Sequence, residues 1–475
     1  MMTVIGLEIH CQLTTATKLF CGCSTDYQDD EPNTHVCPIC LGLPGSLPRI
    51  NQKAVEYALR VAKALDMDIP EESEFARKNY FYPDLPKGFQ ITQYDRPLAV
   101  GGSLRIEDDH GRDKDIRITR IHLEEDPGRL VHRGGGGRPQ YALADYNRSG
   151  TPLMELVTEP DLRSPKEARR FITKLRTVLE YLDVFDGERE GGLRVDANIS
   201  LEGSERVEIK NISSYRGVEK ALMFEITRQK NVLRRGGRVV RETRHFLESR
   251  GVTTSSRSKE EEHDYRYFPE PDLVPLRVRD WLGGIQLPEL PDARRKRFES
   301  QYGLSPDHAR TLTGDPVLAD FFEAVARDVD AVHHAATWVA DTLLGELSYR
   351  DMPVSAISPA LFSGLLSLYE DDRITDTGTV EVLRLMLDEI RDHGTTSPPS
   401  EIVSRLGLEK TSGGAFTDVV TAVLRAHPAA VADVRSGKDG AINYLVGQVM
   451  KETRGRADPR ELRELIRAAI ESGEV

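Results

Sequence analysis

Three glutamates occupy positions where a carboxylate would be removed from water. Glu124 and Glu125 are adjacent, and Glu155 lies inside the apolar, strand-like run Thr151–Val157. An ionised side chain in such a run is strongly unfavourable unless a cation or hydrogen-bond donors compensate its charge. Magnesium prefers oxygen ligands of this kind. The pattern therefore predicts that these glutamates hold a bound cation.

The segment Val4–Leu13 alternates polar and apolar residues with the two-residue period of a strand. Its polar members are Glu8, His10 and Gln12, and we expect its apolar members to face the core: Leu7, Ile9, Cys11 and Leu13. One histidine among carboxylates fits magnesium or manganese better than zinc. The predicted magnesium ligands are therefore Glu8, His10, Glu124, Glu125 and Glu155. The alternative is that Glu8 and His10 form the solvated face of an edge strand.

Four of the five cysteines form two close pairs, C-x-C and C-P-I-C: Cys21, Cys23, Cys37 and Cys40. This spacing is typical of a structural zinc site. A disulfide arrangement is the weaker alternative, because an intracellular chain has little use for disulfides. Four thiolates leave no open coordination position, so we expect the zinc ion to hold a loop (about residues 20–41) and to take no part in catalysis.

Three polar segments carry candidate ligand contacts. Arg77–Asp84 interleaves basic and aromatic residues, Asp145–Gly150 is a polar loop that leads into a strand, and Arg194–Ser200 alternates like a half-exposed strand. The candidate substrate-binding residues in them are Tyr80, Tyr82, Asn147, Arg148 and Asp196. A packed turn explains the first segment equally well, and an ordinary half-exposed sheet explains the third.

Two irregularities lie near the acidic pair. The phase of the apolar residues slips near Thr119, which predicts a β-bulge that re-aims side chains. The glycines at 134–137 lack the Gly-Lys-Ser or Gly-Lys-Thr continuation of a phosphate-binding loop, so they favour the tip of a hairpin.

Composition limits the class of protein. A chain of 475 residues should form two or three domains. Its net charge of -13 argues against binding nucleic acid through a general excess of positive charge, which leaves local basic patches open. No window approaches the roughly 18 apolar residues of a membrane span, and the N-terminus lacks the pattern of a secretory signal. We expect a cytoplasmic protein without a membrane segment.

The order of elements predicts an α+β fold followed by helices. Residues 1–290 show consecutive short strands with occasional helices, which favours a largely antiparallel sheet with flanking helices. We expect this α+β domain to form the catalytic cradle, the concave site that holds the carboxylates. From Pro291 the pattern becomes helical. A boundary near Thr395–Pro399 divides this part into a helical domain, residues 291–398, and a helical tail, residues 399–475.

Several long motifs together resemble one known family. They are Val4–His10, the Cys-Pro-Ile-Cys-Leu-Gly-Leu-Pro-Gly stretch from Cys37, Arg77–Asp84, His263–Pro271 and Asn443–Lys451. The chain is similar over its full length to the B subunits of the aspartyl/glutamyl-tRNA(Asn/Gln) amidotransferases, the GatB family.

The resemblance implies a two-step reaction on a mischarged tRNA. ATP phosphorylates the side-chain carboxylate of Asp-tRNA(Asn) or Glu-tRNA(Gln), and ammonia then displaces phosphate. It implies magnesium ions at the carboxylate cluster, with Glu125, Glu155 and Lys78 as catalytic residues. The implied partners are the glutaminase (amidase) protein of the complex, GatA, which supplies ammonia, and its small protein, GatC. The helical tail would dock tRNA, with candidate contacts at Arg454, Arg456 and Arg460; a solvated, salt-bridged helix explains these arginines equally well.

Two other functions remain open from the sequence. The chain could be a catalytically inactive tRNA-binding paralogue, or a free-standing ligase similar to glutamine synthetase. Convergence of Glu8, His10, Glu125 and Glu155 within metal-bridging distance would favour the enzyme. The choice between Asp-tRNA and Glu-tRNA is not encoded in any feature that we identified.

Overall fold

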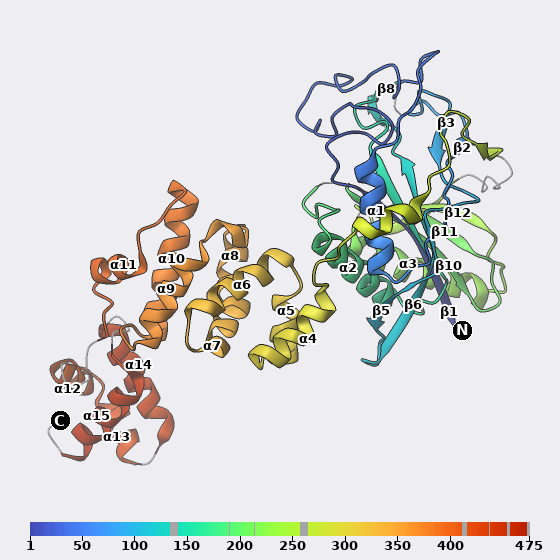
Figure 1. Cartoon of the computed structure of the whole chain (residues 1–475). Coiled ribbons are helices and arrows are strands. Elements are labelled where there is room, and N and C mark those ends of the chain that lie inside the picture. Colours follow the sequence, from blue (N-terminus) through green and yellow to red (C-terminus); the bar gives the residue numbers. More distant parts are fainter. Residues whose placement is uncertain are drawn as a thin grey trace. The chain divides into compact units, whose positions relative to one another are not determined.

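The computed structural model describes residues 1–133, 141–189, 191–212, 214–256, 265–410, 416–436, 438–453 and 457–472. The chain divides into two compact units, Met1–Leu290 and Pro291–Val475 (Figure 1). The predicted hairpin tip at 134–137 and two residues of one family motif, His263 and Asp264, lie outside the described residues.

The first unit holds the strands. They are β1 (Thr3–Gln12), β2 (Ala76–Asn79), β3 (Phe89–Thr92), β4 (Ala99–Val100), β5 (Ser103–Glu107), β6 (Asp113–Glu125), β7 (Arg129–Arg133), β8 (Tyr141–Asp145), β9 (Pro152–Thr158), β10 (Leu193–Leu201), β11 (Val207–Ile212), β12 (Glu242–Leu247), β13 (Val252–Ser255) and β14 (Phe268–Pro269). The central sheet runs in the order β13-β12-β11-β10-β1-β9-β6-β4, with β5 also paired to β6. Its pairs among the described residues are antiparallel except β11 with β12. The prediction of an α+β fold with a largely antiparallel sheet is confirmed.

Three helices pack on the apolar face of this sheet (Figure 1): α1 (Gln52–Ala64), α2 (Pro165–Tyr181) and α3 (Tyr215–Arg234). Each begins after a polar cap, Asn51, Ser164 or Ser214, whose side chain accepts a backbone N–H of the first turn. The apolar residues of β1 lie beneath them at no more than 1% exposure: Ile5, Leu7, Ile9 and Cys11. Burying each isoleucine or leucine side chain stabilises the fold by about 1.5–3 kcal/mol, which fixes the face that β1 presents to the core.

The opposite face of the sheet is polar and is partly covered by the small sheet β14-β2-β3. Hydrogen bonds join the small sheet and the segment after it to β6, since the Ile91 N–H donates to Glu125 and the Leu123 N–H donates to Gln93. The register of β6 against β9 shifts between Ile118 and Arg120. This irregularity confirms the bulge predicted near Thr119, and beyond it Arg120, His122 and Glu124 of β6 line a pocket on the polar face.

The second unit consists of helices. They are α4 (Pro291–Tyr302), α5 (Pro306–Leu312), α6 (Pro316–Asp328), α7 (Val332–Thr337), α8 (Leu344–Tyr349), α9 (Pro359–Glu370), α10 (Asp376–His393), α11 (Pro399–Leu406), α12 (Thr417–Ala426), α13 (Pro428–Arg435), α14 (Asp439–Glu452) and α15 (Pro459–Glu471). A π-helical turn, Trp338–Leu343, joins α7 to α8. None of the described helices combines the length, high hydropathy and low charge that crossing a bilayer requires.

Two separate hydrophobic cores organise these helices. The first extends from Phe298 to Leu408 and the second from Phe416 to Ile470. Ile402 and Val403 of α11 belong to the first core, so α11 packs with the preceding helices although the sequence assigned it to the tail. The first core thus ends at Leu408 and the second begins at Phe416, while the division into residues 291–398 and 399–475 stays a prediction.

Candidate functional site

Neighbouring strands place a carboxylate between two imidazoles on the polar face of the central sheet. His10 on β1 and His122 on β6 are the register partners of Glu155 on β9, one from each side. Directly opposed side chains of antiparallel strands share a face and lie close together. Accordingly, the Nε2 atoms of His10 and His122 each lie 3.3 Å from Oε2 of Glu155.

Glu124 completes this group because it lies two residues beyond His122 on the same face of β6. Its Oε1 is 3.8 Å from Nε2 of His10, and Oε2 accepts a hydrogen bond from Thr92 on the covering sheet. His10, Glu124 and Glu155 each offer one ligand atom within 4.8 Å of the others. Two carboxylates and one imidazole suit a hard divalent cation such as magnesium or manganese.

The charges of this group depend on one another. Burial lowers the pKa of His10, but Glu155 and Glu124 raise it more, to about 9. Burial raises the pKa of Glu155, but His122 and His10 hold it well below its usual value. A proton on His10 therefore compensates the buried carboxylates, and a bound divalent cation would take over that role because metal ligation requires the neutral imidazole.

A second acidic group lies beside the first on the same face: Glu8, Asp196 and Glu208, with ligand atoms within 4.8 Å of one another. Glu8 pairs directly with Asp196 in the sheet register. Burial, followed by the nearby carboxylates, raises the pKa of Glu8. Lys210 offsets part of the charge, with Nζ 3.4 Å from both Asp196 and Glu208. This group therefore has the donors for a second divalent cation.

Glu125 does not join either group. Adjacent residues of a strand point to opposite faces, and the Glu125 carboxylate instead lies 2.5 Å from Nζ of Lys87 and accepts the Ile91 N–H at 2.8 Å. The expectation that Glu125 and Glu124 bind the same ions does not fit this geometry. The sequence interpretation treated two neighbouring glutamates as one pair and did not apply strand alternation to them.

Lys78 lines the pocket together with the His10 and Glu8 groups. Its Nζ lies 4.8 Å from the ring centroid of Tyr265 and 5.9 Å from that of Tyr80. Burial lowers the pKa of Lys78, but Tyr267 and Glu124 raise it more, so it exceeds the usual value. The ammonium therefore stays charged, which suits binding an anion and does not suit a base.

The remaining candidate substrate contacts divide into two sets. Asp196 lines the pocket, and Tyr80 packs edge-on against Tyr265 beside Lys78. Tyr82 is 51% exposed and is not among the pocket's lining residues. Asn147 and Arg148 lie away from the pocket and hold loops.

Asn147 and Arg148 hydrogen-bond backbone groups of neighbouring loops, and a contact of either residue with substrate stays a prediction. The Asn147 side chain accepts the His35 N–H at 2.8 Å and donates to the Glu31 carbonyl at 2.9 Å. Arg148 donates to the carbonyls of residues 127 and 128. Since Glu31 and His35 belong to the cysteine loop, Asn147 positions that loop.

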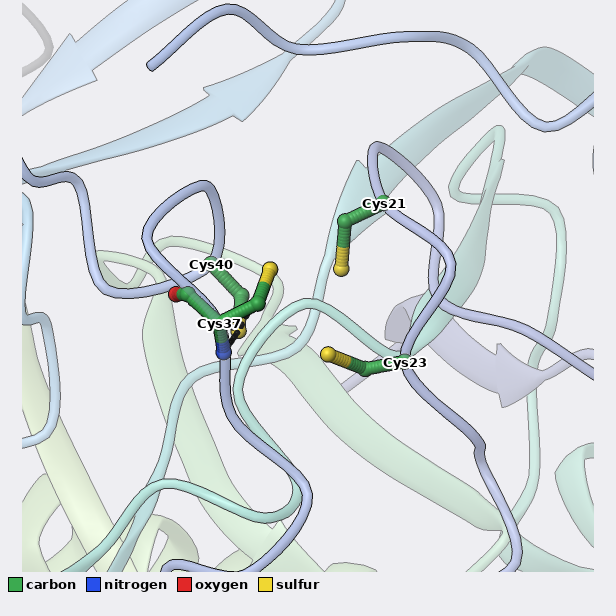
Figure 2. Close-up of side chains that lie close together, drawn as sticks. All are labelled: Cys21, Cys23, Cys37 and Cys40. Carbon is green, nitrogen blue, oxygen red and sulfur yellow. Dashed lines mark hydrogen bonds between the residues drawn. The ribbon is translucent and has the colours of Figure 1, made fainter. Parts of the chain in front are cut away.

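The four cysteines converge, as their spacing predicts (Figure 2). Figure 2 shows that Cys21 and Cys23 come from one turn and Cys37 and Cys40 from another, with their sulfur atoms directed toward a common centre. The Cys37 N–H donates to the Cys40 sulfur at 3.2 Å. Four thiols in this arrangement fit a tetrahedral zinc ion, with no position left for a substrate.

A buried lysine that the sequence interpretation did not identify supports this cluster. Lys18 is 0% exposed. Its Nζ donates to the His35 carbonyl at 2.7 Å and to the Tyr146 carbonyl at 3.3 Å, and it lies 3.7 Å from the Cys40 sulfur. A lysine is unusual in a buried segment. Its position just before Leu19 and Phe20 could therefore have identified Lys18 from the sequence. Lys18 places one positive charge beside a cluster of thiolates.

Comparison with known proteins identifies the family. Residues 3–282 match the GatB/GatE catalytic domain, and residues 320–470 match the GatB domain. The chain belongs to the GatB family. It is 64% identical over 469 residues to the B subunit of the aspartyl/glutamyl-tRNA(Asn/Gln) amidotransferase of Methanospirillum hungatei, a match that covers 99% of this chain and 98% of the relative.

Other relatives carry the same name. That of Methanoregula boonei is 62% identical over 474 residues, covering 99% of this chain and 98% of the relative. That of Halobacterium salinarum is 53% identical over 485 residues, covering 98% and 96%. The resemblance to the GatB family predicted from the motifs is confirmed, and the carboxylate pocket lies within the matched catalytic domain.

The matched GatB domain contains the arginines expected to contact tRNA. Arg460 is exposed in the first turn of α15, where its backbone N–H donates to Asp458. Arg454 and Arg456 lie outside the described residues. A contact of Arg460 with RNA remains a prediction.

Proposed function

We infer that this chain is the GatB component of an ATP-dependent aminoacyl-tRNA amidotransferase, and that its pocket performs the amidation. One observation carries the proposal: in a chain of the GatB family, His10, Glu124 and Glu155 converge from three central strands on one pocket. A catalytically inactive paralogue has no need of this buried, charged group, which is unfavourable for folding when no ligand binds it. Nothing in the described part of the fold favours that alternative.

The proposed reaction has two steps. An oxygen of the Asp or Glu side chain on the tRNA attacks the γ-phosphorus of ATP; the bond to the β,γ-bridging oxygen breaks, and ADP leaves with the electron pair. Ammonia then attacks the acyl carbon, phosphate leaves with its bonding electrons, and loss of a proton gives the amide. Both steps move negative charge onto oxygens that need positive partners.

The residues of the pocket would supply these partners. His10, Glu124 and Glu155 would hold one magnesium ion, and Glu8 with its acidic neighbours would hold another. When bound, magnesium would neutralise the phosphates of ATP and align the attacking oxygen. Lys78 would stabilise charge on the phosphoryl group, since its ammonium stays protonated. We assign Glu125 a supporting role, because it joins β6 to β3 through the Ile91 N–H.

The partners follow from the same proposal. The relatives are named for Asp- and Glu-tRNA substrates, so we propose that this chain acts on one or both of these tRNAs in the cytoplasm. Ammonia would come from the glutaminase protein GatA, in a complex that includes the small protein GatC. The cysteine cluster would hold zinc as a structural ion, and the tail would dock tRNA through residues such as Arg460.

Ammonia-supported amidation tests the proposal without the glutaminase activity. The co-expressed complex is given ATP, magnesium, ammonium chloride and either Asp-tRNA(Asn) or Glu-tRNA(Gln), and the attached amino acid is identified after deacylation. We expect Asn or Gln to form with the wild type, and the rate to fall about 10²- to 10³-fold or more in Glu155→Gln.

The matched control is Glu202→Gln, because Glu202 is exposed and its side chain contacts only the Met2 N–H among the described residues. This control should keep the wild-type rate. Equal rates for Glu155→Gln and the wild type would contradict the assignment of the pocket. Failure of the folded wild-type complex to amidate either tRNA would contradict the proposed function itself.

A further inference from the structure

Arg120 lies on the same strand face as the pocket's ligand groups and has no role so far. It lies on β6 two residues before His122, just beyond the bulge, and is the register partner of Val157. Its side chain lines the pocket with Glu124, Glu155 and Lys78. The bulge therefore brings a guanidinium to the edge of a pocket built from carboxylates and imidazoles.

The guanidinium of Arg120 lacks a partner within the described part of the chain. Its Nε is shielded from solvent and makes no hydrogen bond, and no carboxylate of the described residues lies within ion-pair distance of the side chain. By contrast, Lys210 in the same pocket lies beside Asp196 and Glu208. A shielded donor without a partner is unfavourable unless a ligand satisfies it. The described structure thus leaves Arg120 available for an anion.

Other unpaired atoms gather at the same place. Five shielded side-chain polar atoms lack a partner among the described residues, and three of them belong to residues of this polar face: Arg120 Nε, His122 Nδ1 and Asn198 Oδ1. Such atoms are rare in folded proteins. Their grouping around the pocket indicates a polar ligand there and not a defect of packing.

We propose that Arg120 binds a non-bridging oxygen of the γ-phosphoryl group while this group passes from ATP to the side-chain carboxylate. This inference rests on the proposed function. In the transfer, the bond between the carboxylate oxygen and phosphorus forms while the bond to the β,γ-bridging oxygen breaks, so charge on the equatorial oxygens persists throughout. A planar guanidinium with several N–H donors suits such oxygens better than an ammonium does.

The position of Arg120 favours phosphoryl binding over binding of the substrate's carboxylate. Register alignment places Arg120 and Glu8 on opposite sides of Val157, so Arg120 and the Glu8 group border the pocket from different strands. A phosphoryl group held by cations at the acidic groups has three oxygens, and at least one of them can face β6. Lys78 of the covering sheet would contact the same group from above.

The experiment measures binding as well as turnover. The complete complex is titrated by calorimetry, in the presence of magnesium, with ADP and with the non-hydrolysable β,γ-imido analogue of ATP. The variants are Arg120→Met, which removes the charge, and Arg120→Lys, which keeps the charge but loses the planar guanidinium with its several N–H donors. Arg117→Met is the matched control, since Arg117 lies on the same strand but pairs at the surface with Asp161.

We expect Arg120→Met to bind the imido analogue at least about tenfold more weakly than the wild type does, with its affinity for ADP unchanged. Arg120→Lys should lie between Arg120→Met and the wild type, and Arg117→Met should match the wild type. In ammonia-supported amidation, Arg120→Met should lower kcat and leave the KM for tRNA unchanged.

Three results would overturn this proposal. They are unchanged affinity of Arg120→Met for the imido analogue, an equal loss of affinity for ADP, and a raised KM for tRNA with normal nucleotide binding, which would assign Arg120 to the substrate's carboxylate. Because wild-type amidation is measured in parallel, failure of the proposed function is seen separately, as an inactive wild-type complex.

Discussion

Among the described residues, the first unit contains a cysteine cluster and two acidic groups that can hold metal ions, and the cluster is built differently from the acidic groups. The cysteine cluster draws its ligands from two turns within residues 21–40 and is supported by the buried Lys18. In the carboxylate pocket, the His10, Glu124 and Glu155 group draws its ligands from β1, β6 and β9, which are separated in the sequence but adjacent in the sheet. The ligands of the cysteine cluster are close together in the sequence, and its four thiols fill every coordination position. The ligands of the carboxylate pocket are brought together only by the register of the strands.

This difference in construction indicates a structural role for the cysteine cluster and a chemical role for the carboxylate pocket. Four thiolates around one ion leave no coordination position, so such a site stabilises a fold. Two carboxylates and one imidazole leave positions open for phosphate oxygens, and they lie beneath a covering sheet that carries Lys78. We therefore expect changes in the cysteine cluster to affect folding first, and changes in the pocket to affect chemistry first.

Cys40→Ser should cause the largest loss of stability among the variants considered. Loss of one thiolate should remove most of the bound zinc and lower the free energy of unfolding of the first unit by about 4 kcal/mol or more. Metal analysis after dialysis and urea unfolding measure both effects. Cys11→Ala is the control, because Cys11 is buried in the sheet and is not part of the cluster. Full zinc content in Cys40→Ser would contradict the assignment of a four-thiolate site.

The adjacent residues Glu124 and Glu125 allow a function in metal binding to be separated from a function in folding, because they face opposite sides of β6. Glu124→Gln should raise the magnesium concentration for half-maximal amidation by at least about tenfold, with little effect on stability. Glu125→Gln should leave this magnesium requirement unchanged and lower the free energy of unfolding by about 3 kcal/mol, because it leaves Lys87, whose side chain is 9% exposed, without its charged partner. Magnesium titrations and urea unfolding of both variants decide the question; a larger magnesium effect for Glu125→Gln would reverse the assignment.

Lys18→Met should give the smallest of these effects. Methionine fills similar space but donates no hydrogen bond, so the carbonyls of His35 and Tyr146 lose a donor. We expect zinc release to a chelating dye to be about tenfold faster, and unfolding to become easier by about 1–3 kcal/mol. Lys63→Met is the control, since Lys63 donates to the Ile285 carbonyl away from the cysteines. Equal release rates in the two variants would show that Lys18 does not support the cluster.

The cysteine cluster could be predicted from the sequence because its ligands are local. Spacing alone identified Cys21, Cys23, Cys37 and Cys40. The α+β fold, the buried face of β1 and the bulge near Thr119 also followed from two-residue alternation and its interruption. These features depend on residues that are close in the chain.

The carboxylate pocket was predicted in part, because its composition depends on strand order. Glu8, His10, Glu124 and Glu155 were identified one by one, but no local pattern shows that Glu155 lies between His10 and His122, or that Glu8 joins Asp196 and Glu208. The separation of Glu125 from Glu124 was not predicted because strand alternation, which the sequence did contain, was not applied to this pair. The loop role of Asn147 and Arg148 was not predicted for another reason: the sequence of a polar loop does not show whether its side chains bind backbone or a ligand.

Anomalous diffraction from crystals of the complex grown with manganese tests the central claim most directly. Data collected on both sides of the manganese and zinc absorption edges identify each ion at its position. We predict a manganese peak among His10, Glu124 and Glu155 and a zinc peak among the four cysteine sulfurs. A pocket without a manganese peak at saturating manganese, or a zinc peak within the pocket, would contradict this assignment.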